Sequence, residues 1–226
     1  PKLLEDGLKS WQEMEQYLVD LLAARRRDAA TATARKDLLS SLTAAGEDAS
    51  LLSEEEVRAT VGMLLFAGHE TTTNLITNGV LLLLRHPEAL AALRRDPALL
   101  APMIEEMLRY ESPVQLITRI PDEDVVLAGQ PVSKGQRVLL VLASANRDPA
   151  QFPEPDQFII GRRENRHLSF GLGIHFCVGA ALARVEAQLA FGQLLERWPT
   201  LRLADETIAW RDSLAFRCPQ RLHITA

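Results

Sequence analysis

A single cysteine in a glycine-rich segment is the residue of this sequence best placed to do chemistry. Cys177 lies in FGLGIHFCVG, residues 170–179, and an alanine-rich helical pattern begins directly after it. Glycine lets backbone amides turn towards a ligand, and the positive end of a helix stabilises a thiolate, which is a nucleophile or a metal ligand. A nucleophile needs a base, and His175 lies two residues away, but no triad or oxyanion-hole pattern accompanies it. A small buried hydrophobic residue is the alternative for any lone cysteine.

Composition excludes several kinds of site and partner. The 226 residues contain only two cysteines, Cys177 and Cys218, so a disulfide framework, a paired Cys-x-x-Cys zinc site and a four-thiolate iron–sulfur cluster are excluded. The net charge of −5, with mixed signs throughout, argues against nucleic acid and anionic membranes as partners. There is no apolar run of about 20 residues and no signal-peptide pattern. We expect a cytoplasmic protein that binds small molecules or proteins, with no nucleic acid and no membrane among its partners.

The first half of the chain is predicted to be helical. Apolar residues at three- and four-residue spacings predict a helix over residues 1–28, followed by a short helix that Gly46 ends. Ser53 and Glu56 form a capping-box pattern, and the next proline is Pro87, so one helix could run about 33 residues, or about 50 Å. It is apolar nearly all round, which predicts a helix buried through the middle of a larger body.

The second half mixes helices with short strands. Two apolar runs around Gly129 and Gly135 predict a β-hairpin, and residues 201–210 with 221–225 suggest a small closing sheet. Further helical patterns cover residues 87–95, 97–110 and 178–198. The fold class is therefore predicted to be mainly α with small β-sheets (α+β).

The segment HLSFGLGIHFCVGAALARVE, residues 167–186, resembles the haem-binding signature of the cytochrome P450 family. Three motifs precede it in the family's order: AGHETT (67–72), EMLR (106–109) and ANRDP (145–149). The resemblance implies the cytochrome P450 fold of the soluble bacterial type, with a long central helix and a cysteine-ligand loop. It also implies that residues 1–226 are the C-terminal portion of a single haem-thiolate monooxygenase domain whose N-terminal part is absent. The matching signature residues are Phe170, Gly171, Gly173, His175, Cys177 and Gly179.

The resemblance assigns roles around a haem b cofactor. Cys177 would be the axial ligand of the haem iron. Arg119 and His175 resemble residues that hold haem propionates, and an exposed Arg119 without this role is the alternative. Ala67 and Gly68 would form a widened helical turn that admits oxygen and water. The other signature residues in contact with the cofactor would be Phe170, Gly171 and Gly179.

Glu70 and Thr71 resemble the acid and alcohol pair that orders water and delivers protons during oxygen activation. The alternative is a helix-crossing site, in which Gly68 admits a second helix and Thr71 bonds back to a backbone carbonyl. Peroxide-driven members of the family typically lack the pair, so its presence favours the use of dioxygen.

Glu106 and Arg109 lie three residues apart on one predicted helix. On residue spacing alone, they form a solvated ion pair that contributes little. The resemblance instead implies a buried cluster completed by Arg162, with Arg163 as the alternative donor.

The resemblance also points to a mostly apolar set of substrate contacts, which implies a hydrophobic small-molecule substrate; ordinary core residues are the alternative. The implied activity inserts one oxygen atom from dioxygen, with electrons from NAD(P)H through ferredoxin and ferredoxin reductase. A missing N-terminal segment is a further expected partner, because the long buried helix needs covering residues. A catalytically silent haem-binding or protein-interaction module and a peroxide-driven peroxygenase are the other functions considered. The contact candidates are Met63, Phe66, Val114, Gln115, Leu214 and Phe216.

Overall fold

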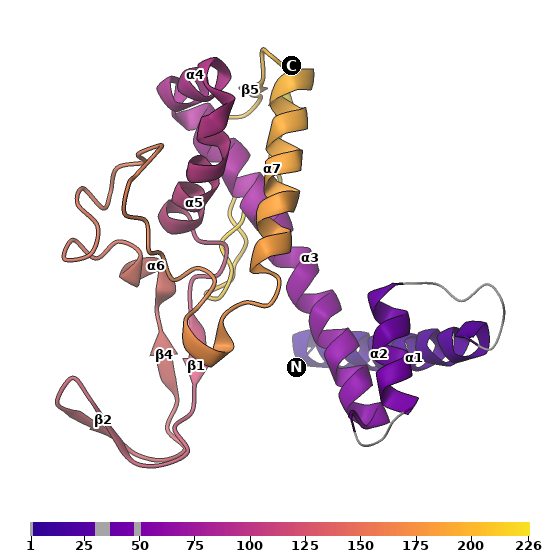
Figure 1. The fold of residues 1–226 in the computed structure, drawn as a ribbon. Helices are drawn as coiled ribbons and strands as arrows, with labels where there is room; N and C mark the ends of the chain where they lie inside the picture. Colours follow the sequence, from indigo (N-terminus) through magenta and orange to yellow (C-terminus); the bar gives the residue numbers. More distant parts are fainter. Residues whose placement is uncertain (1, 30–36, 48–50) are drawn as a thin grey trace. The chain divides into compact units, whose positions relative to one another are not determined.

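The computed structural model of the chain describes residues 2–29, 37–47 and 51–226 (Figure 1). The chain divides into two compact units, Pro1–His69 and Glu70–Ala226, and each is described by itself. The described residues are mostly helical, with three two-stranded sheets. The predicted fold class, mainly α with small β-sheets, is confirmed.

In its described residues, the first unit contains two helices and the beginning of a third, which continues into the second unit. Ser53 caps the third helix as predicted: its backbone N donates to the Glu56 carboxylate (2.8 Å), and the Glu56 backbone N donates to the Ser53 hydroxyl (3.2 Å). The helix is 32 residues long, close to the predicted length. The three helices are α1 (Lys2–Ala29), α2 (Leu38–Glu47) and α3 (Glu54–Arg85).

Gly46 does not end α2, which corrects the prediction, since the helix continues to Glu47. A Cβ atom at Gly46 would lie only 2.8 Å from Cγ2 of Val57, a fully buried residue of α3. The glycine is needed for the close packing of α2 against α3. In the sequence, a glycine required for helix packing cannot be distinguished from a glycine that ends a helix.

The second half of α3 is buried, as predicted for a central helix. At Gly79, an added Cβ would lie 2.4 Å from Cζ of Phe191 and 2.7 Å from Sδ of Met107, so α3 approaches two other helices very closely. In the first half of the helix, the exposed fractions of Met63 and Phe66 are 51% and 61%, so the described residues of this chain do not cover that face, in keeping with the expectation that further residues cover it. These two side chains do not enter the core of the first unit.

The remaining helices belong to the second unit, where α5 packs against α7 (Figure 1). Pro87 is the first residue of α4 and Pro97 opens η1, as their positions in the sequence predict. The core of this unit is built from apolar residues of α3, α4, α5 and α7. The elements are α4 (Pro87–Arg95), η1 (Pro97–Leu99), α5 (Leu100–Tyr110), α6 (Leu142–Ala145), η2 (Gly173–His175) and α7 (Ala180–Arg197).

All described strands pair antiparallel and in twos. The pairs are β1 (Ile117–Arg119) with β4 (Val138–Leu140), β2 (Val125–Leu127) with β3 (Gln130–Val132), and β5 (Arg202–Leu203) with β6 (Ile224–Thr225). The last pair lies within the two segments predicted to form a closing sheet. Among the described residues, no helix is long and apolar enough to cross a membrane.

The predicted hairpin is shorter than expected, because its second apolar run has a different partner. Ala128 and Gly129 have positive φ values of 48° and 81°, so a tight two-residue turn pairs β2 with β3 directly. The apolar run after Gly135 is β4, and it pairs with β1, where Thr118 lies opposite Leu139. Because β2 already pairs with β3 across the tight turn, the second apolar run is not part of the hairpin.

Candidate functional site: the cysteine loop and the helices around it

The loop that carries Cys177 is closed by its own backbone hydrogen bonds. The Cys177 backbone N donates to the Phe170 carbonyl (2.8 Å), and the Phe176 backbone N donates to the Gly173 carbonyl (3.0 Å). Gly171 and Gly173 have φ values of 73° and 71°, a region where a side chain causes strain. The glycine residues therefore permit a tight, preformed loop at this position.

Cys177 lies at the N-terminus of α7, and its carbonyl accepts a hydrogen bond from the Ala180 backbone N (3.2 Å). The residue is exposed, and it lies next to the positive end of the helix. Apolar side chains of the same loop are exposed beside it, with Ile174 at 98%. An exposed apolar patch around an exposed sulfur is typical of a ligand site. The other exposed apolar residues of the loop are Leu172, Phe176 and Val178.

The donor set at this loop fits a metal that already carries its other ligands. Among the described residues, no group of three or more His, Cys, Asp or Glu side chains could hold a metal ion. One thiolate alone cannot complete the coordination of a bare ion, but it can serve as the axial ligand of a metal in a macrocycle such as haem. The exposed apolar surface around Cys177 suits the flat, apolar face of such a group.

The two residues expected near haem carboxylates, His175 and Arg119, lie on different elements of the second unit. His175 is exposed in η2, two residues before Cys177. Arg119 is half-buried at the end of β1, where its guanidinium donates to the Thr118 carbonyl (3.0 Å). Gly179, the residue before α7, would bring an added Cβ to 3.8 Å from the Cys177 sulfur, an ordinary contact distance.

A charged cluster that contacts Phe170 of the cysteine loop is not indicated by the sequence. Glu105 accepts hydrogen bonds from Arg184 (2.7 and 2.8 Å) and from Nε2 of His167 (3.1 Å). The Arg184 guanidinium lies 4.5 Å from the centre of the Phe170 ring, so it rests against the residue whose carbonyl binds the Cys177 amide. Glu105 and Arg184 are 79 residues apart, and nothing in the sequence indicates their pairing.

Burial alone would raise the pKa of Glu105, but hydrogen bonds and charges from Arg184 and His167 lower it to about 2. The unfolded chain therefore binds the proton of Glu105 more tightly than the folded protein does. The ionised Glu105 contributes its full stabilisation of the fold above about pH 5, and this contribution is lost as the pH falls towards 2. We expect the unfolding free energy of Glu105→Gln to fall less than that of the wild type over this range. Urea denaturation at several pH values measures the difference. Glu88→Gln, at an exposed carboxyl, should keep the wild-type decline, and the same decline in Glu105→Gln would contradict the prediction.

Glu106 and Arg109 of α5 form a fully buried ion pair with two parallel hydrogen bonds of 2.8 Å. Arg162 joins it, with Nε 3.1 Å from Oε2 of Glu106. Arg163, the alternative donor, is exposed. The arrangement differs from the solvated pair that residue spacing alone suggests. The structure brings Glu106, Arg109 and Arg162 together.

The Glu106 cluster ties α5 to the irregular chain before the cysteine loop. Arg109 donates to the carbonyl groups of Asn146 (3.0 Å), Pro155 (2.8 Å) and Gln157 (3.0 Å). The side-chain oxygen of Asn146, in the ANRDP motif, accepts from the Leu168 backbone N (2.7 Å), just before the loop. A continuous set of hydrogen bonds therefore joins α5 to the base of the loop that holds Cys177.

Glu70 lies on α3 at the start of the second unit, and its carboxylate accepts a hydrogen bond from the Arg211 guanidinium (2.8 Å). Thr71, the next residue, is half-buried. Ala67 and Gly68 precede them in the first unit. The helix is α-helical over this whole range, so the widened turn expected at Ala67 and Gly68 is not present. A glycine weakens a helix by about 0.5–1 kcal/mol and does not by itself interrupt its hydrogen bonds.

The structure brings together the substrate-contact candidates of the second unit. Val114 pairs with Phe216 in an antiparallel bridge, and the Gln115 backbone N donates to the Ala215 carbonyl (2.8 Å). Leu214 lies in the adjoining turn with 86% of its surface exposed. Met63 and Phe66, described above, belong to the first unit.

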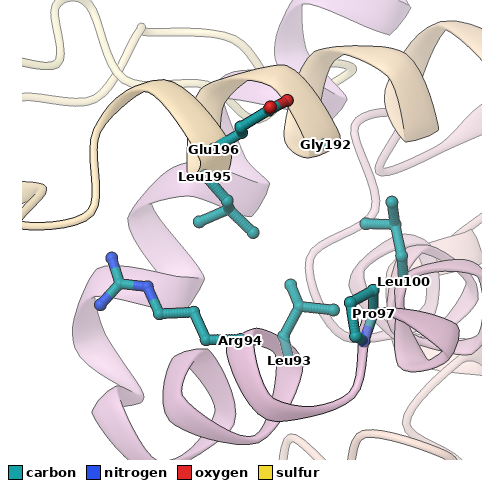
Figure 2. A pocket seen from close by; sticks show the side chains of 7 residues that line it. All are labelled: Leu93, Arg94, Pro97, Leu100, Gly192, Leu195 and Glu196. Atoms are coloured by element: carbon teal, nitrogen blue, oxygen red, sulfur yellow. The ribbon is translucent and has the colours of Figure 1, made fainter.

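A separate pocket of about 240 Å³ lies between α4, α5 and α7, and Leu93 and Leu195 point into it (Figure 2). The lining contains none of the site residues expected from the sequence. It is mostly hydrocarbon, and the charged Arg94 and Glu196 also contribute to it. The full lining is Leu93, Arg94, Pro97, Leu100, Gly192, Leu195 and Glu196.

Known proteins resemble this chain over nearly its whole length. The biotin biosynthesis cytochrome P450 of Bacillus subtilis is 44% identical over 223 residues, which are 99% of this chain and 55% of that protein. The vitamin D(3) 25-hydroxylase of Pseudonocardia autotrophica is 45% identical over 226 residues, 98% of this chain and 55% of the relative. The chain thus spans about half the length of these relatives.

Solved structures agree with the sequence comparisons. The myxobacterial cytochrome P450 CYP267B1, crystallised with myristic acid, matches with a TM-score of 0.92 and 44% identity, covering 99% of this chain and 55% of that one. The sequence profile of the family described as Cytochrome P450 matches residues 1–208. Since that match includes the cysteine loop and all three upstream motifs, the chain belongs to the cytochrome P450 family.

Proposed function

We propose that residues 1–226 are the C-terminal portion of a single haem-thiolate monooxygenase domain, which inserts one oxygen atom from dioxygen into a hydrophobic small molecule. The observation that carries the proposal is the exposed Cys177 at the N-terminus of α7, in a loop closed by glycine residues and surrounded by apolar side chains. The proposal agrees with membership of the cytochrome P450 family.

The residues present fit haem b. Cys177 would bind its iron through sulfur, the apolar side chains of the loop would contact its face, and Arg119 and His175 would hold its carboxylates. When bound, the haem supplies the redox chemistry that activates dioxygen. The hydrogen bonds from α5 through Asn146 hold the backbone at the base of the loop that carries the sulfur.

Glu70 and Thr71 would supply protons to the reaction. Glu70 is partly exposed and paired with Arg211, so its carboxylate can exchange protons with solvent while the ion pair fixes its position. Thr71 would pass protons onward through its hydroxyl group. Leu214, Val114 and Phe216 offer an apolar surface that would hold substrate and exclude water.

The proposed partners are a hydrophobic substrate, ferredoxin with its reductase as the route from NAD(P)H, and an N-terminal segment of the same enzyme. Two relatives support a hydrophobic substrate, since one is named a vitamin D(3) hydroxylase and the other binds myristic acid. Both cysteines are free, which suits the reducing cytoplasm, where we place the activity.

The carbon monoxide spectrum of the haem-loaded, reduced protein tests this function. A red-shifted, thiolate-type Soret band is expected, together with product formation that requires ferredoxin and its reductase. Failure to retain haem would favour a silent interaction module. Product formed from peroxide alone, without a reductase, would favour a peroxygenase.

Thr71→Ala should retain haem, substrate binding and NAD(P)H consumption while diverting electrons to peroxide, because the methyl group cannot pass on a proton. Glu70→Gln should instead slow turnover, because it keeps the shape but removes the acid. Product formed per NAD(P)H oxidised measures the first effect, and the rate of NAD(P)H oxidation measures the second. Unchanged coupling in Thr71→Ala, with an unchanged rate in Glu70→Gln, would leave the pair with a structural role only.

A further inference from the structure

The charged cluster of Glu105, His167 and Arg184 joins three parts of the second unit beside the cysteine loop. Glu105 comes from α5, Arg184 from α7, and His167 from the irregular chain that leads into the loop. Both oxygens of the Glu105 carboxylate accept hydrogen bonds from Arg184, at 2.7 and 2.8 Å, so the plane of the guanidinium is fixed. The cluster therefore holds one oriented guanidinium group next to the loop.

His167 is held on both sides of its ring, and its side chain is only 3% exposed. The Ser169 backbone N donates to Nδ1 of His167 (3.2 Å), so Nδ1 carries no proton and Nε2 donates to Glu105 (3.1 Å). The cluster then carries one positive charge, on Arg184, and one negative charge, on Glu105.

The ring of Phe170 lies against this cluster. The guanidinium carbon of Arg184 is 4.5 Å from the ring centre, and the ring centres of His167 and Phe170 are 5.9 Å apart. The Phe170 carbonyl accepts a hydrogen bond from the Cys177 backbone N (2.8 Å). The residue that the cluster contacts is therefore also the residue that closes the loop on Cys177.

Arg184 is also within electrostatic reach of Cys177 itself. Hydrogen bonding to Glu105 raises the pKa of the Arg184 guanidinium, burial lowers it, and the charges of Glu105 and Cys177 raise it further. The guanidinium also donates to the Ala180 carbonyl (3.3 Å), in the first turn of α7. A positive charge at this place favours added negative charge at the ligand site, and the Glu105 carboxylate offsets part of that effect.

We propose that Arg184, held by Glu105, is a positioning residue of the haem site: it fixes Phe170 at the base of the loop, and its charge raises the reduction potential of the iron that Cys177 would bind. The fixing of the loop stands on the contacts of the folded chain, whereas the effect on the potential rests on the proposed function. Reduction by ferredoxin adds one electron, and therefore one negative charge, which a nearby cation favours and a nearby anion opposes. Arg184 and Glu105 thus act on the potential in opposite directions, although both hold the loop in the same way.

Reduction potentials of the haem-loaded variants test the effect of charge. Arg184→Gln should shift the potential to a more negative value and Glu105→Gln to a more positive one, each by on the order of a tenfold change in the ferric-to-ferrous ratio, or about 59 mV. Arg197→Gln, which removes a charge in the last turn of α7, is the matched control and should leave the potential unchanged. Shifts of Arg184→Gln and Glu105→Gln in the same direction, or no shift in either, would overturn the effect of charge. A thiolate-type spectrum in the same samples would leave the proposed function standing.

Hydrogen exchange tests the fixing of the loop without haem. The Cys177 backbone N–H is bonded to the Phe170 carbonyl, so its exchange should become several-fold faster in both Arg184→Gln and Glu105→Gln. Arg197→Gln should exchange like the wild type. Unchanged exchange in Arg184→Gln would overturn the positioning role. If the haem-loaded wild type shows no thiolate-type spectrum, the effect on the potential is overturned together with the proposed function, and the exchange result still decides whether the cluster holds the loop.

Discussion

Replacing Cys177 with serine will abolish the thiolate-type spectrum of the ferrous carbon monoxide complex, or prevent the protein from retaining haem. A serine hydroxyl stays protonated and is a poorer donor to iron than a thiolate. His175 is the only other ligand-type side chain between residues 170 and 179, and we assign it to the haem carboxylates. The measurement is the reduced carbon monoxide difference spectrum, normalised to haem content.

Cys218→Ser provides the matched control for this substitution. Cys218 is a buried residue of the C-terminal segment, and its backbone carbonyl accepts a hydrogen bond from the Arg211 backbone N (3.0 Å). We expect its replacement to leave the spectrum unchanged. Equal effects of the two serine substitutions would count against Cys177 as the iron ligand.

Arg109→Leu is expected to lower the free energy of unfolding by about 3–5 kcal/mol, the usual cost of breaking a buried ion pair. The change leaves Glu106 buried with one of its two guanidinium partners missing, and three backbone carbonyl groups each lose a hydrogen bond. Urea denaturation followed by circular dichroism measures the loss.

The neighbouring Arg163 supplies the control for charge removal. It is exposed, so Arg163→Leu should change the unfolding free energy only slightly. Similar losses in Arg109→Leu and Arg163→Leu would show that the cluster is not the source of stability.

Much of the helical framework could be predicted from local sequence. The start of α3 depends on Ser53 and Glu56, three residues apart, and the prolines at 87 and 97 open the next elements. Gly46 was misinterpreted because a glycine needed for helix packing and a glycine that ends a helix have the same local signal. The predicted partner of β4 is wrong, because β4 pairs with β1, a strand that lies before the hairpin in the chain.

The site could be predicted only where its residues share a short segment. Cys177 and its glycine residues lie within ten positions, so their chemistry is visible in the sequence. Arg211 and Glu70 are 141 residues apart, and Glu105 and Arg184 are 79 apart. Pairing over such separations is set by how the helices pack, and an arginine gives no sign in the sequence of which carboxylate it will reach.

The hydrogen bonds of Arg109 also bear on the order in which the protein folds. Its guanidinium donates hydrogen bonds to carbonyl groups that lie 37, 46 and 48 residues further along the chain. Closing loops of that length costs conformational entropy before any contact is gained, so these bonds form late relative to the local turns of α5. The irregular chain between Asn146 and Leu168 leads directly into the cysteine loop. We therefore expect the cysteine loop to reach its final position only after α5 has bound this segment.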